Sequence, residues 1–179
     1  LQGDLRPITI GTGIEPANPC EQATKLDCGV TYSFNTTNET NDYDNINELY
    51  ESCIDESMDL FWDYEARDIL LSFDVLEQGD VTIEMTNLRT FFDFFVFRTC
   101  APGVLENAII SDCIGISYRG GLADETLLLP DLAAGTYYII VDGSRSSNRG
   151  TFDIRVDCPI VEPDPCTLVD EVLACGNTY

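Results

Sequence analysis

The feature that most constrains the fold is a series of short strand-like segments separated by turn residues. Eight segments are rich in β-branched and aromatic residues and are bounded by Gly, Asn, Asp or Pro. They span residues 27–35, 67–75, 80–88, 91–99, 113–119, 125–132, 135–143 and 150–158. Because little of the chain has a helical pattern, the sequence predicts an all-β fold, a jelly-roll-like antiparallel β-sandwich.

Some of these segments alternate as half-buried strands do. Val81, Ile83 and Met85 alternate with polar residues in one segment, and Phe152 and Ile154 do so in another. One face of each strand should therefore pack in a core while the other meets water.

Two segments, residues 91–97 and 137–141, are apolar on both faces. This pattern predicts central strands whose outer face is covered by a loop, an extension or another molecule. If another molecule covers the first of them, Phe92 and Phe94 are the candidate assembly contacts.

The charge balance excludes several classes of function. The chain of 179 residues has 32 acidic and nine basic residues, a formal charge of -23, and no histidine. Such a surface repels nucleic acid and anionic membranes, and catalysis through histidine is excluded. No apolar run reaches the roughly 20 residues of a membrane span.

Eight cysteines, an even number, predict a disulfide framework formed in an oxidising compartment. We therefore expect a secreted, extracellular protein at the cell surface, and the beginning LQGDLRPITI fits a mature chain that has lost its signal peptide. Eight cysteines can pair in 105 ways, so the connectivity stays open. Local spacing favours the pairs Cys20 with Cys28, Cys100 with Cys113, and Cys166 with Cys175, which leaves Cys53 with Cys158.

A motif near the beginning recurs at the end. Residues 19–32 read PCEQATKLDCGVTY and residues 165–179 read PCTLVDEVLACGNTY. We expect an extended segment over 1–18, a disulfide-stapled sandwich over 19–158, a proline-rich linker over 159–165, and the beginning of a second Cys-repeat unit, or a connector between subunits, over 166–179. Ile8 and Ile10 alternate in the first segment as in a strand donated to another sheet.

Residues 129–141, LPDLAAGTYYIIV, and 150–156, GTFDIRV, carry a resemblance to a known family. They resemble the closing strands of bacterial pre-peptidase C-terminal domains, and residues 93–96 match an upstream strand of that family. The resemblance implies a secreted, non-catalytic β-sandwich that accompanies other modules and in some cases binds calcium, polysaccharide or protein fibres. The chain also resembles repeat domains of large surface proteins of Bacteroidota-type bacteria.

Two sequons and an acidic loop are the candidate sites for modification and metal binding. Asn35 and Asn38 each begin an N-x-Thr sequon, which is either a glycan acceptor or an Asn/Thr-rich turn. Oxygen ligands at near-alternate positions favour calcium, although a solvated acidic loop is the alternative. These ligands are Asp42, Asp44, Asn45, Asn47 and Glu48.

Acidic residues also surround Trp62, the single tryptophan. Carboxylates beside an aromatic ring can hydrolyse a glycoside or can bind sugar without cleaving it, but nothing in the sequence shows that two of them converge. We therefore expect a protein that is not an enzyme.

The function that these features favour is that of an extracellular structural or adhesive protein. It would self-associate as a subunit of a bacterial surface fibre, or serve as one repeat of a multi-domain stalk, linked through its terminal segments. The alternative is a carbohydrate- or protein-binding accessory module of a secreted hydrolase.

Overall fold

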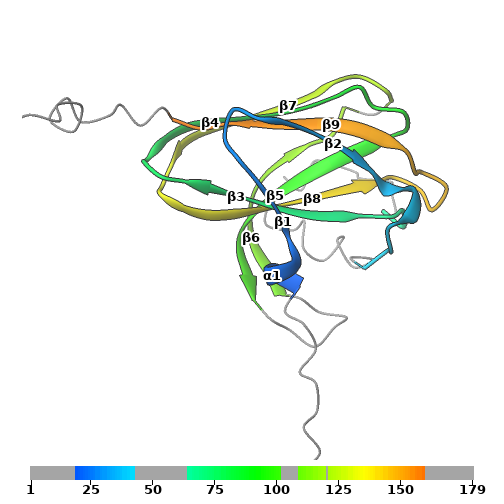
Figure 1. Cartoon of the computed structure of the whole chain (residues 1–179), viewed down its shortest axis with the longest axis horizontal. Coiled ribbons are helices and arrows are strands. Elements are labelled where there is room, and N and C mark those ends of the chain that lie inside the picture. The colour runs from blue at the N-terminus through cyan, green and yellow to red at the C-terminus, as the bar shows by residue number, and fades with distance from the viewer. Residues whose placement is uncertain (1–18, 43–63, 102–108, 120, 160–179) are drawn as a thin grey trace, which may run out of the picture.

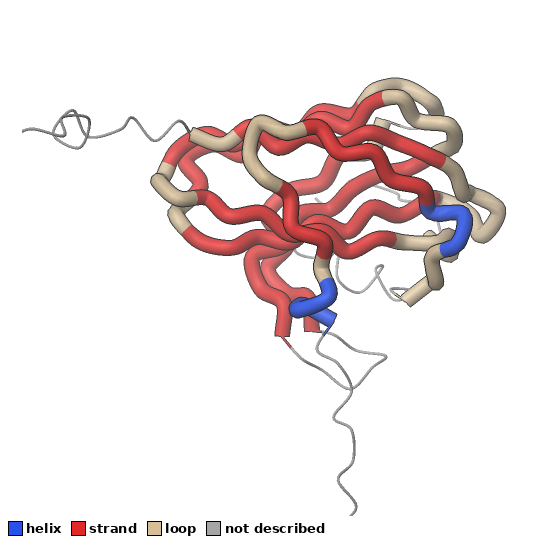
Figure 2. The backbone as a smooth tube through the Cα atoms, viewed as in Figure 1, coloured by secondary structure: helices blue, strands red, loops and turns tan. Residues whose placement is uncertain are grey.

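The computed structural model describes residues 19–42, 64–101, 109–119 and 121–159. These residues form two facing β-sheets, which confirms the predicted β-sandwich (Figure 1). The described helices are short (Figure 2), namely α1 (Pro19–Gln22) and the 3-10 helix η1 (Thr36–Asn38).

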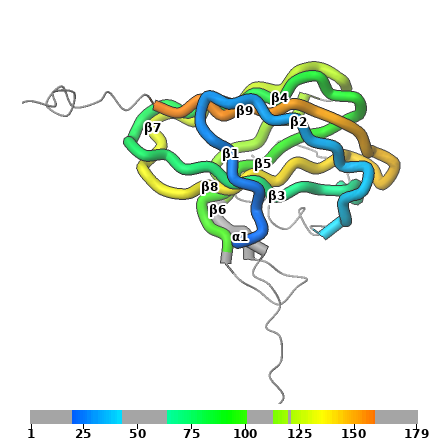
Figure 3. The backbone as a smooth tube through the Cα atoms, viewed as in Figure 1, coloured from blue at the N-terminus to red at the C-terminus, as the bar shows by residue number. Residues whose placement is uncertain are grey.

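Along most of the chain, successive strands belong alternately to one sheet and to the other (Figure 3). The five-stranded sheet has the order β1 (Thr24–Leu26), β3 (Ile69–Val75), β8 (Gly135–Gly143), β5 (Phe92–Ala101) and β6 (Ile109–Ser117). The four-stranded sheet has the order β2 (Thr31–Asn35), β9 (Thr151–Asp157), β4 (Gly79–Thr86) and β7 (Glu125–Leu132). Neighbouring strands are antiparallel except that β1 runs parallel to β3.

The predicted strands differ from the observed ones mainly at two places. Strand β6 begins at Ile109, earlier than predicted, because its backbone continues to pair with β5 as far as Ala101. The segment predicted over 27–35 is a strand only from Thr31, and the short strand β1 before it was not predicted.

The main core lies between the sheets and follows the predicted alternation. Val81, Ile83 and Met85 of β4 are fully buried, as are Phe152 and Ile154 of β9. Burying large apolar side chains in this way contributes about 1.5–3 kcal/mol for each, so the inter-sheet layer is the main source of stability.

The two strands that are apolar on both faces, β5 and β8, lie inside the five-stranded sheet, as predicted. Their outward residues Phe95, Phe97 and Ile140 form a second buried cluster with Tyr64, which precedes β3. The Tyr64 ring stands edge-on to the ring of Phe95, with 5.2 Å between centroids. A segment of the same chain therefore covers the outer face.

The expected assembly role of Phe92 and Phe94 is wrong. Both side chains point into the main core between the sheets and have at most 1% of their surface exposed. The alternation of β5 places its outward face on Phe95 and Phe97 instead, so these two phenylalanines offer no surface to a neighbour. Ile8 and Ile10 lie outside the described residues.

Candidate functional site

The first copy of the repeated motif, which we call the first Cys unit (residues 19–32), joins the two sheets at one edge. Its residues form α1, β1 and the beginning of β2, and β1 and β2 belong to different sheets. The turn between them needs Gly29, whose φ of +79° favours glycine. The N–H of Gly29 donates to the carbonyl oxygen of Val156 at 2.7 Å, which fixes the turn against β9.

Both cysteines of the first Cys unit bond to distant cysteines of the sandwich. Cys20 bonds to Cys100 at the end of β5, and Cys28 bonds to Cys158, which follows β9. The Cα atoms lie 5.8 and 5.5 Å apart in the two bonds, within the usual range for disulfides.

The pairing favoured by local spacing is therefore wrong for the described cysteines. Cys20 does not pair with Cys28, Cys100 does not pair with Cys113, and Cys53 is not the partner of Cys158. The sheets bring residues together that are 80 and 130 positions apart in sequence, which spacing cannot show. Cys113 is also disulfide-bonded, whereas Cys53, Cys166 and Cys175 lie outside the described residues.

A pocket of about 250 Å³ opens beside the Cys28–Cys158 disulfide. Its walls come from β1, the end of β3 and the residues after β9, and Leu76 on its rim is 74% exposed. The lining residues are Lys25, Leu26, Asp27, Cys28, Asp74, Leu76, Cys158 and Pro159.

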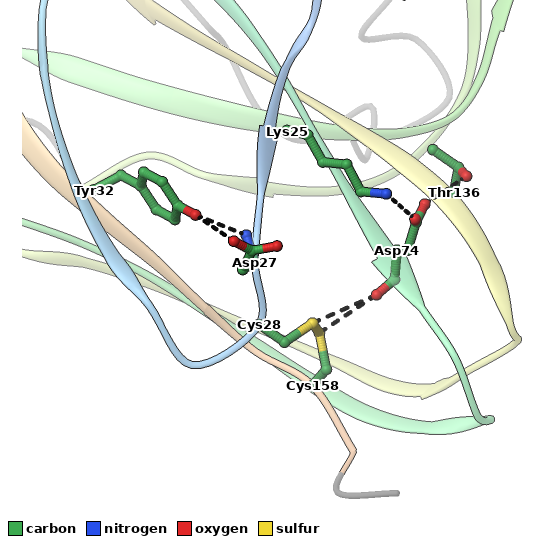
Figure 4. Close-up of polar contacts among 7 residues, drawn as sticks. All are labelled: Lys25, Asp27, Cys28, Tyr32, Asp74, Thr136 and Cys158. Atoms are coloured by element: carbon green, nitrogen blue, oxygen red, sulfur yellow. Dashed lines mark hydrogen bonds and ion pairs between the residues drawn. A yellow bond between two sulfur atoms is a disulfide. The ribbon is translucent and has the colours of Figure 1, made fainter.

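Lys25 and Asp74 form an ion pair in the wall of this pocket (Figure 4). The Lys25 Nζ atom lies 2.5 Å from Asp74 Oδ2, and the Thr136 hydroxyl donates to the other carboxylate oxygen at 2.7 Å. The Asp74 carboxylate raises the pKa of Lys25, and the hydrogen bonds from Lys25 and Thr136 lower the pKa of Asp74. Because Lys25 is 62% exposed, water screens the pair and it adds little to stability.

The sulfur atoms of the Cys28–Cys158 disulfide also lie close to the backbone of Asp74. Cys28 Sγ and Cys158 Sγ lie 3.4 and 3.8 Å from the backbone carbonyl oxygen of Asp74. A disulfide sulfur has no hydrogen to donate, so these are packing contacts and not hydrogen bonds. The pocket thus has an apolar wall, the Lys25–Asp74 ion pair and the Asp27 carboxylate, which accepts a hydrogen bond from the Tyr32 hydroxyl, and this arrangement can bind a small group.

A second group of polar residues is buried beside Tyr64, on the outer face of the five-stranded sheet. Asp93 of β5 and Asp142 of β8 are cross-strand partners, and the Tyr64 hydroxyl donates to Asp93 Oδ2 at 2.9 Å. Asp93 is 6% exposed and Asp142 is fully buried, and the N–H of Gly143 donates to Asp142 Oδ1 at 2.6 Å. Because both side chains are buried, neither solvent nor a substrate has ready access to these two carboxyl groups.

The electrostatics of this buried group follow from desolvation. Burial raises the pKa of Asp93 to about 7, and the negative charge of Glu125 adds to the increase, whereas the hydrogen bond from Tyr64 opposes it. Burial also raises the pKa of the Tyr64 hydroxyl, together with the nearby charge of Asp93. Asp93 is therefore protonated over much of the acidic range in which an ordinary aspartate is ionised.

Glu125 joins the two sheets near this group. It begins β7 and is 1% exposed, and its carboxylate accepts hydrogen bonds from the Ser117 hydroxyl of β6 and from the N–H of Arg119. Both of these hydrogen bonds connect the beginning of β7 to β6 and the residues that follow it, so Glu125 has a structural role as a hydrogen-bond acceptor.

The two predicted glycan acceptors are accessible. Both asparagines are exposed: Asn35 ends the edge strand β2, and Asn38 ends the 3-10 helix η1 that follows it. The Asn35 Oδ1 atom accepts a hydrogen bond from the N–H of Thr37 at 2.9 Å and so caps the 3-10 helix η1.

The predicted calcium ligands are described only in part. Asp42 is exposed, and its N–H donates to the buried carboxylate of Asp68 at 3.0 Å, whereas Asp44, Asn45, Asn47 and Glu48 lie outside the described residues. No group of three or more potential ligands could hold a metal ion within the described part of the chain. Trp62 and most of the acids around it also lie outside the described residues.

Sequence reasoning missed two features of these sites. The first is the pairing of Lys25 with Asp74, although Lys25 is the only lysine of the chain and lies between the two cysteines of the first Cys unit. The second is the buried group around Asp93, for which the signal was a pair of aspartates inside otherwise apolar strands.

Within the described residues, no helix is both long and apolar enough to cross a bilayer. No family model matches the chain, and no curated protein matches it either.

Comparison with solved structures finds other β-rich domains at low similarity. The pre-peptidase C-terminal domain of a collagenase from Bacillus anthracis has 11% identity and a TM-score of 0.47, over 75% of this chain and 94% of that one. CorA, a surface-associated copper-binding protein of Methylomicrobium album BG8, has 10% identity and a TM-score of 0.43, over 76% and 98%. PliG of Aeromonas hydrophila, a periplasmic inhibitor of g-type lysozyme, has 16% identity and a TM-score of 0.35, over 75% and 94%.

Proposed function

We propose that this chain is a non-catalytic structural module of an extracellular protein, either a subunit of a bacterial surface fibre or one repeat of a multi-domain stalk. The observation that carries the proposal is the first Cys unit, which closes the sandwich through two disulfides and then recurs in sequence after the linker. A unit of this kind is suited to joining successive modules end to end.

The disulfides support an extracellular setting. Cys20–Cys100 and Cys28–Cys158 each join an edge of the sandwich to a strand end far away in sequence. Bonds of this kind form and persist in oxidising compartments, where a module is exposed to proteolysis and mechanical load. The charge of -23 keeps such modules soluble and apart until specific contacts form.

The burial of the carboxyl groups supports a role without catalysis. Asp93, Asp142 and Glu125 are each at most 6% exposed, and their contacts are with neighbouring strands and Tyr64. A catalytic carboxylate must reach the proton or carbon on which it acts. These three groups are therefore better suited to a structural role than to hydrolysis.

Electron microscopy of the native extracellular material tests this proposal. We expect filaments or extended multi-domain particles, because modules joined at their ends form linear assemblies. Separate globules of single modules, in both the presence and the absence of calcium, would contradict it.

The alternative, a binding module of a secreted hydrolase, is favoured by the pocket beside the Cys28–Cys158 disulfide, with Leu76 on its rim. Small ligand sites are concave and mostly apolar with a few polar groups, as this pocket is. A globular monomer that binds a polysaccharide array, and loses that binding in Leu76→Asp, would support the alternative over the fibre.

Glycans and calcium belong to the same proposal as secondary features. A glycan on Asn35 would project from the edge strand β2 and shield that edge from unwanted strand pairing. A calcium ion would have to be bound mainly by residues 44–48, with Asp42 at the border of that segment.

A further inference from the structure

Strand β8 connects two opposite ends of the sandwich, which we call the pocket end and the Phe91 end (Figure 1). At the pocket end Thr136 pairs with Asp74, which lines the pocket beside the disulfide. At the Phe91 end Gly143 pairs with Phe92, the first residue of β5. Strand residues rise about 3.3 Å each, so these two pairs are roughly 23 Å apart. Groups at the two ends therefore meet only when two molecules come together.

The Phe91 end carries exposed apolar side chains. The Phe91 side chain is 48% exposed, and Leu122, in the loop between β6 and β7, is 59% exposed. The loops that carry them are neighbours, because a Cβ atom at Gly121 would lie 3.9 Å from the Phe91 Cε1 atom. Two exposed apolar side chains on neighbouring loops form a small patch of the kind that contacts another molecule.

The pocket at the opposite end matches a phenylalanine side chain in size and lining. Its volume is about 250 Å³, and its lining residues include Leu26, Leu76 and Pro159. A cavity of about 150 Å³ can hold a benzene ring, so a phenylalanine ring fits this pocket. Leu76 is 74% exposed on the rim and would be covered by the same contact.

Exposed arginines lie in three loops at the Phe91 end, those between β4 and β5, between β6 and β7, and between β8 and β9. The described residues of these loops include one acidic residue, Asp124. The first and third loops touch, because a Cβ atom at Gly150 would lie 3.4 Å from the Arg89 Cβ atom. The connection between β2 and β3 is acidic, so the excess of positive charge belongs to these three loops. Their exposed arginines are Arg89, Arg119, Arg145 and Arg149.

The turns at the pocket end carry the opposite charge. The basic residues near the pocket are paired within the molecule, Lys25 with Asp74 and Arg155 with Asp157. Four more carboxylates are exposed in the turns of this end and form no ion pair with a described residue. They complement the arginines of the Phe91 end. These carboxylates belong to Asp27, Glu77, Asp80 and Asp131.

We propose that copies of this sandwich dock head to tail, with Phe91 of one copy in the pocket of the next and the arginines of the three loops against its exposed carboxylates. The contact joins two different surfaces, so every docked copy keeps one open surface at each end of the row and the row can grow. The inference rests on the proposed function, because it names the contact by which modules of a fibre or stalk meet.

Ionic strength controls this contact, because each copy has a formal charge of -23. At about 0.15 M salt the Debye length is roughly 8 Å, so charges far from the contact are screened. Arginine and carboxylate groups that meet at the contact are closer than this distance and still attract each other. We therefore expect copies to associate at this ionic strength.

Sedimentation velocity of the full chain at increasing protein concentration, in about 0.15 M salt, tests the proposal. The average mass of the parent should rise with concentration. Phe91→Asp should weaken the association at least about tenfold, because the ring that fills the pocket is lost. A parent that stays monomeric at every concentration, or a Phe91→Asp variant that associates like the parent, would overturn the proposal.

Leu128→Asp is the matched control. Leu128 is 57% exposed in the middle of the edge strand β7, away from both ends of the sandwich. This variant introduces the same charge at an equally exposed apolar position and should associate as the parent does. Association that is lost in Leu128→Asp and kept in Phe91→Asp would place the contact at the edge of β7 and overturn the head-to-tail arrangement.

Two variants with one blocked end each test the direction of the contact. Phe91→Asp keeps an intact pocket, and Leu76→Asp keeps an intact Phe91. Each should be monomeric alone at concentrations where the parent associates, whereas their mixture should form dimers that grow no further. A mixture without dimers would overturn the proposal. Both residues are exposed, so circular dichroism and melting temperatures like those of the parent should confirm that the variants fold.

The double variant Arg89→Glu/Arg149→Glu tests the charge of the contact. It should weaken association at least about tenfold, because like charges then face each other across the contact. Unchanged association would overturn the assignment of a second copy as the partner. Filaments in native material together with a strictly monomeric purified chain would overturn this contact and leave the fibre proposal standing, so the two failures are distinguishable.

Discussion

The double variant Cys28→Ser/Cys158→Ser is expected to lower the free energy of unfolding by about 4 kcal/mol. The two cysteines are 130 residues apart, but the bond between Cys20 and Cys100 shortens the loop that they close to roughly half of that. A loop of this size still restricts the unfolded chain strongly, and the bond also fixes β1 and β2 at the edges of their sheets. Urea unfolding of the variant and the parent under oxidising conditions measures the difference.

Tyr32→Phe is the matched control for this variant. It changes the same Cys unit and removes the two exposed hydrogen bonds of the Tyr32 hydroxyl, one donated to the Asp27 carboxylate and one accepted from the Asp27 N–H, but it leaves both disulfides in place. We expect a loss of about 1 kcal/mol or less. A disulfide variant no less stable than this control would show that the Cys28–Cys158 bond does not hold the sheets together.

Asp93→Asn is expected to stabilise the protein at pH 8 by about 4 kcal/mol and to change it little at pH 4. The pKa of Asp93 is raised from 3.8 to about 7 in the folded protein, so the folded state holds a proton that the unfolded state has already released between these values. The stability contributed by the protonated carboxyl is fully present below pH 3.8 and is lost as the pH rises toward 7. Asparagine remains neutral and can still accept the hydrogen bond from Tyr64.

Comparing the variant with the parent at each pH removes the contributions of other groups. Hydrogen bonds lower the pKa of Asp74 and of Asp153, so these two carboxylates stabilise the folded state at pH values above the range in which they titrate. Both aspartates are present in the variant and in the parent, so their contributions cancel in the comparison. Asp124→Asn, at an exposed position, should give no such pH dependence. An equal effect of Asp93→Asn at both pH values would show that its carboxyl titrates normally.

The strands could be predicted from sequence because their signals are local. Alternation in β4 and β9 and the apolar runs of β5 and β8 each specify which faces are buried, whatever the topology. Strand β1 has three residues and a parallel neighbour far away in sequence, so no local pattern marks it. Its one local signal is Leu26, a single apolar residue between exposed ones.

The disulfides and the buried carboxyl group could not be predicted for a related reason. Cys20 and Cys28 are close in sequence, but Cys20 precedes β1 and bonds to a partner at the end of β5, whereas Cys28 follows β1 and bonds to a partner after β9. Likewise, the sequence shows Asp93 and Asp142 in separate strands, and only the register of β5 with β8 makes them neighbours. Both features depend on which strands pair, which one sequence does not specify.

A disulfide map of the native extracellular protein, digested without reduction, tests the central claim most directly. The account predicts Cys20–Cys100 and Cys28–Cys158 within this sandwich. A bond between Cys20 and Cys28, the pair that local spacing favours, would contradict the claim that the first Cys unit joins the two sheets through disulfides to distant strands.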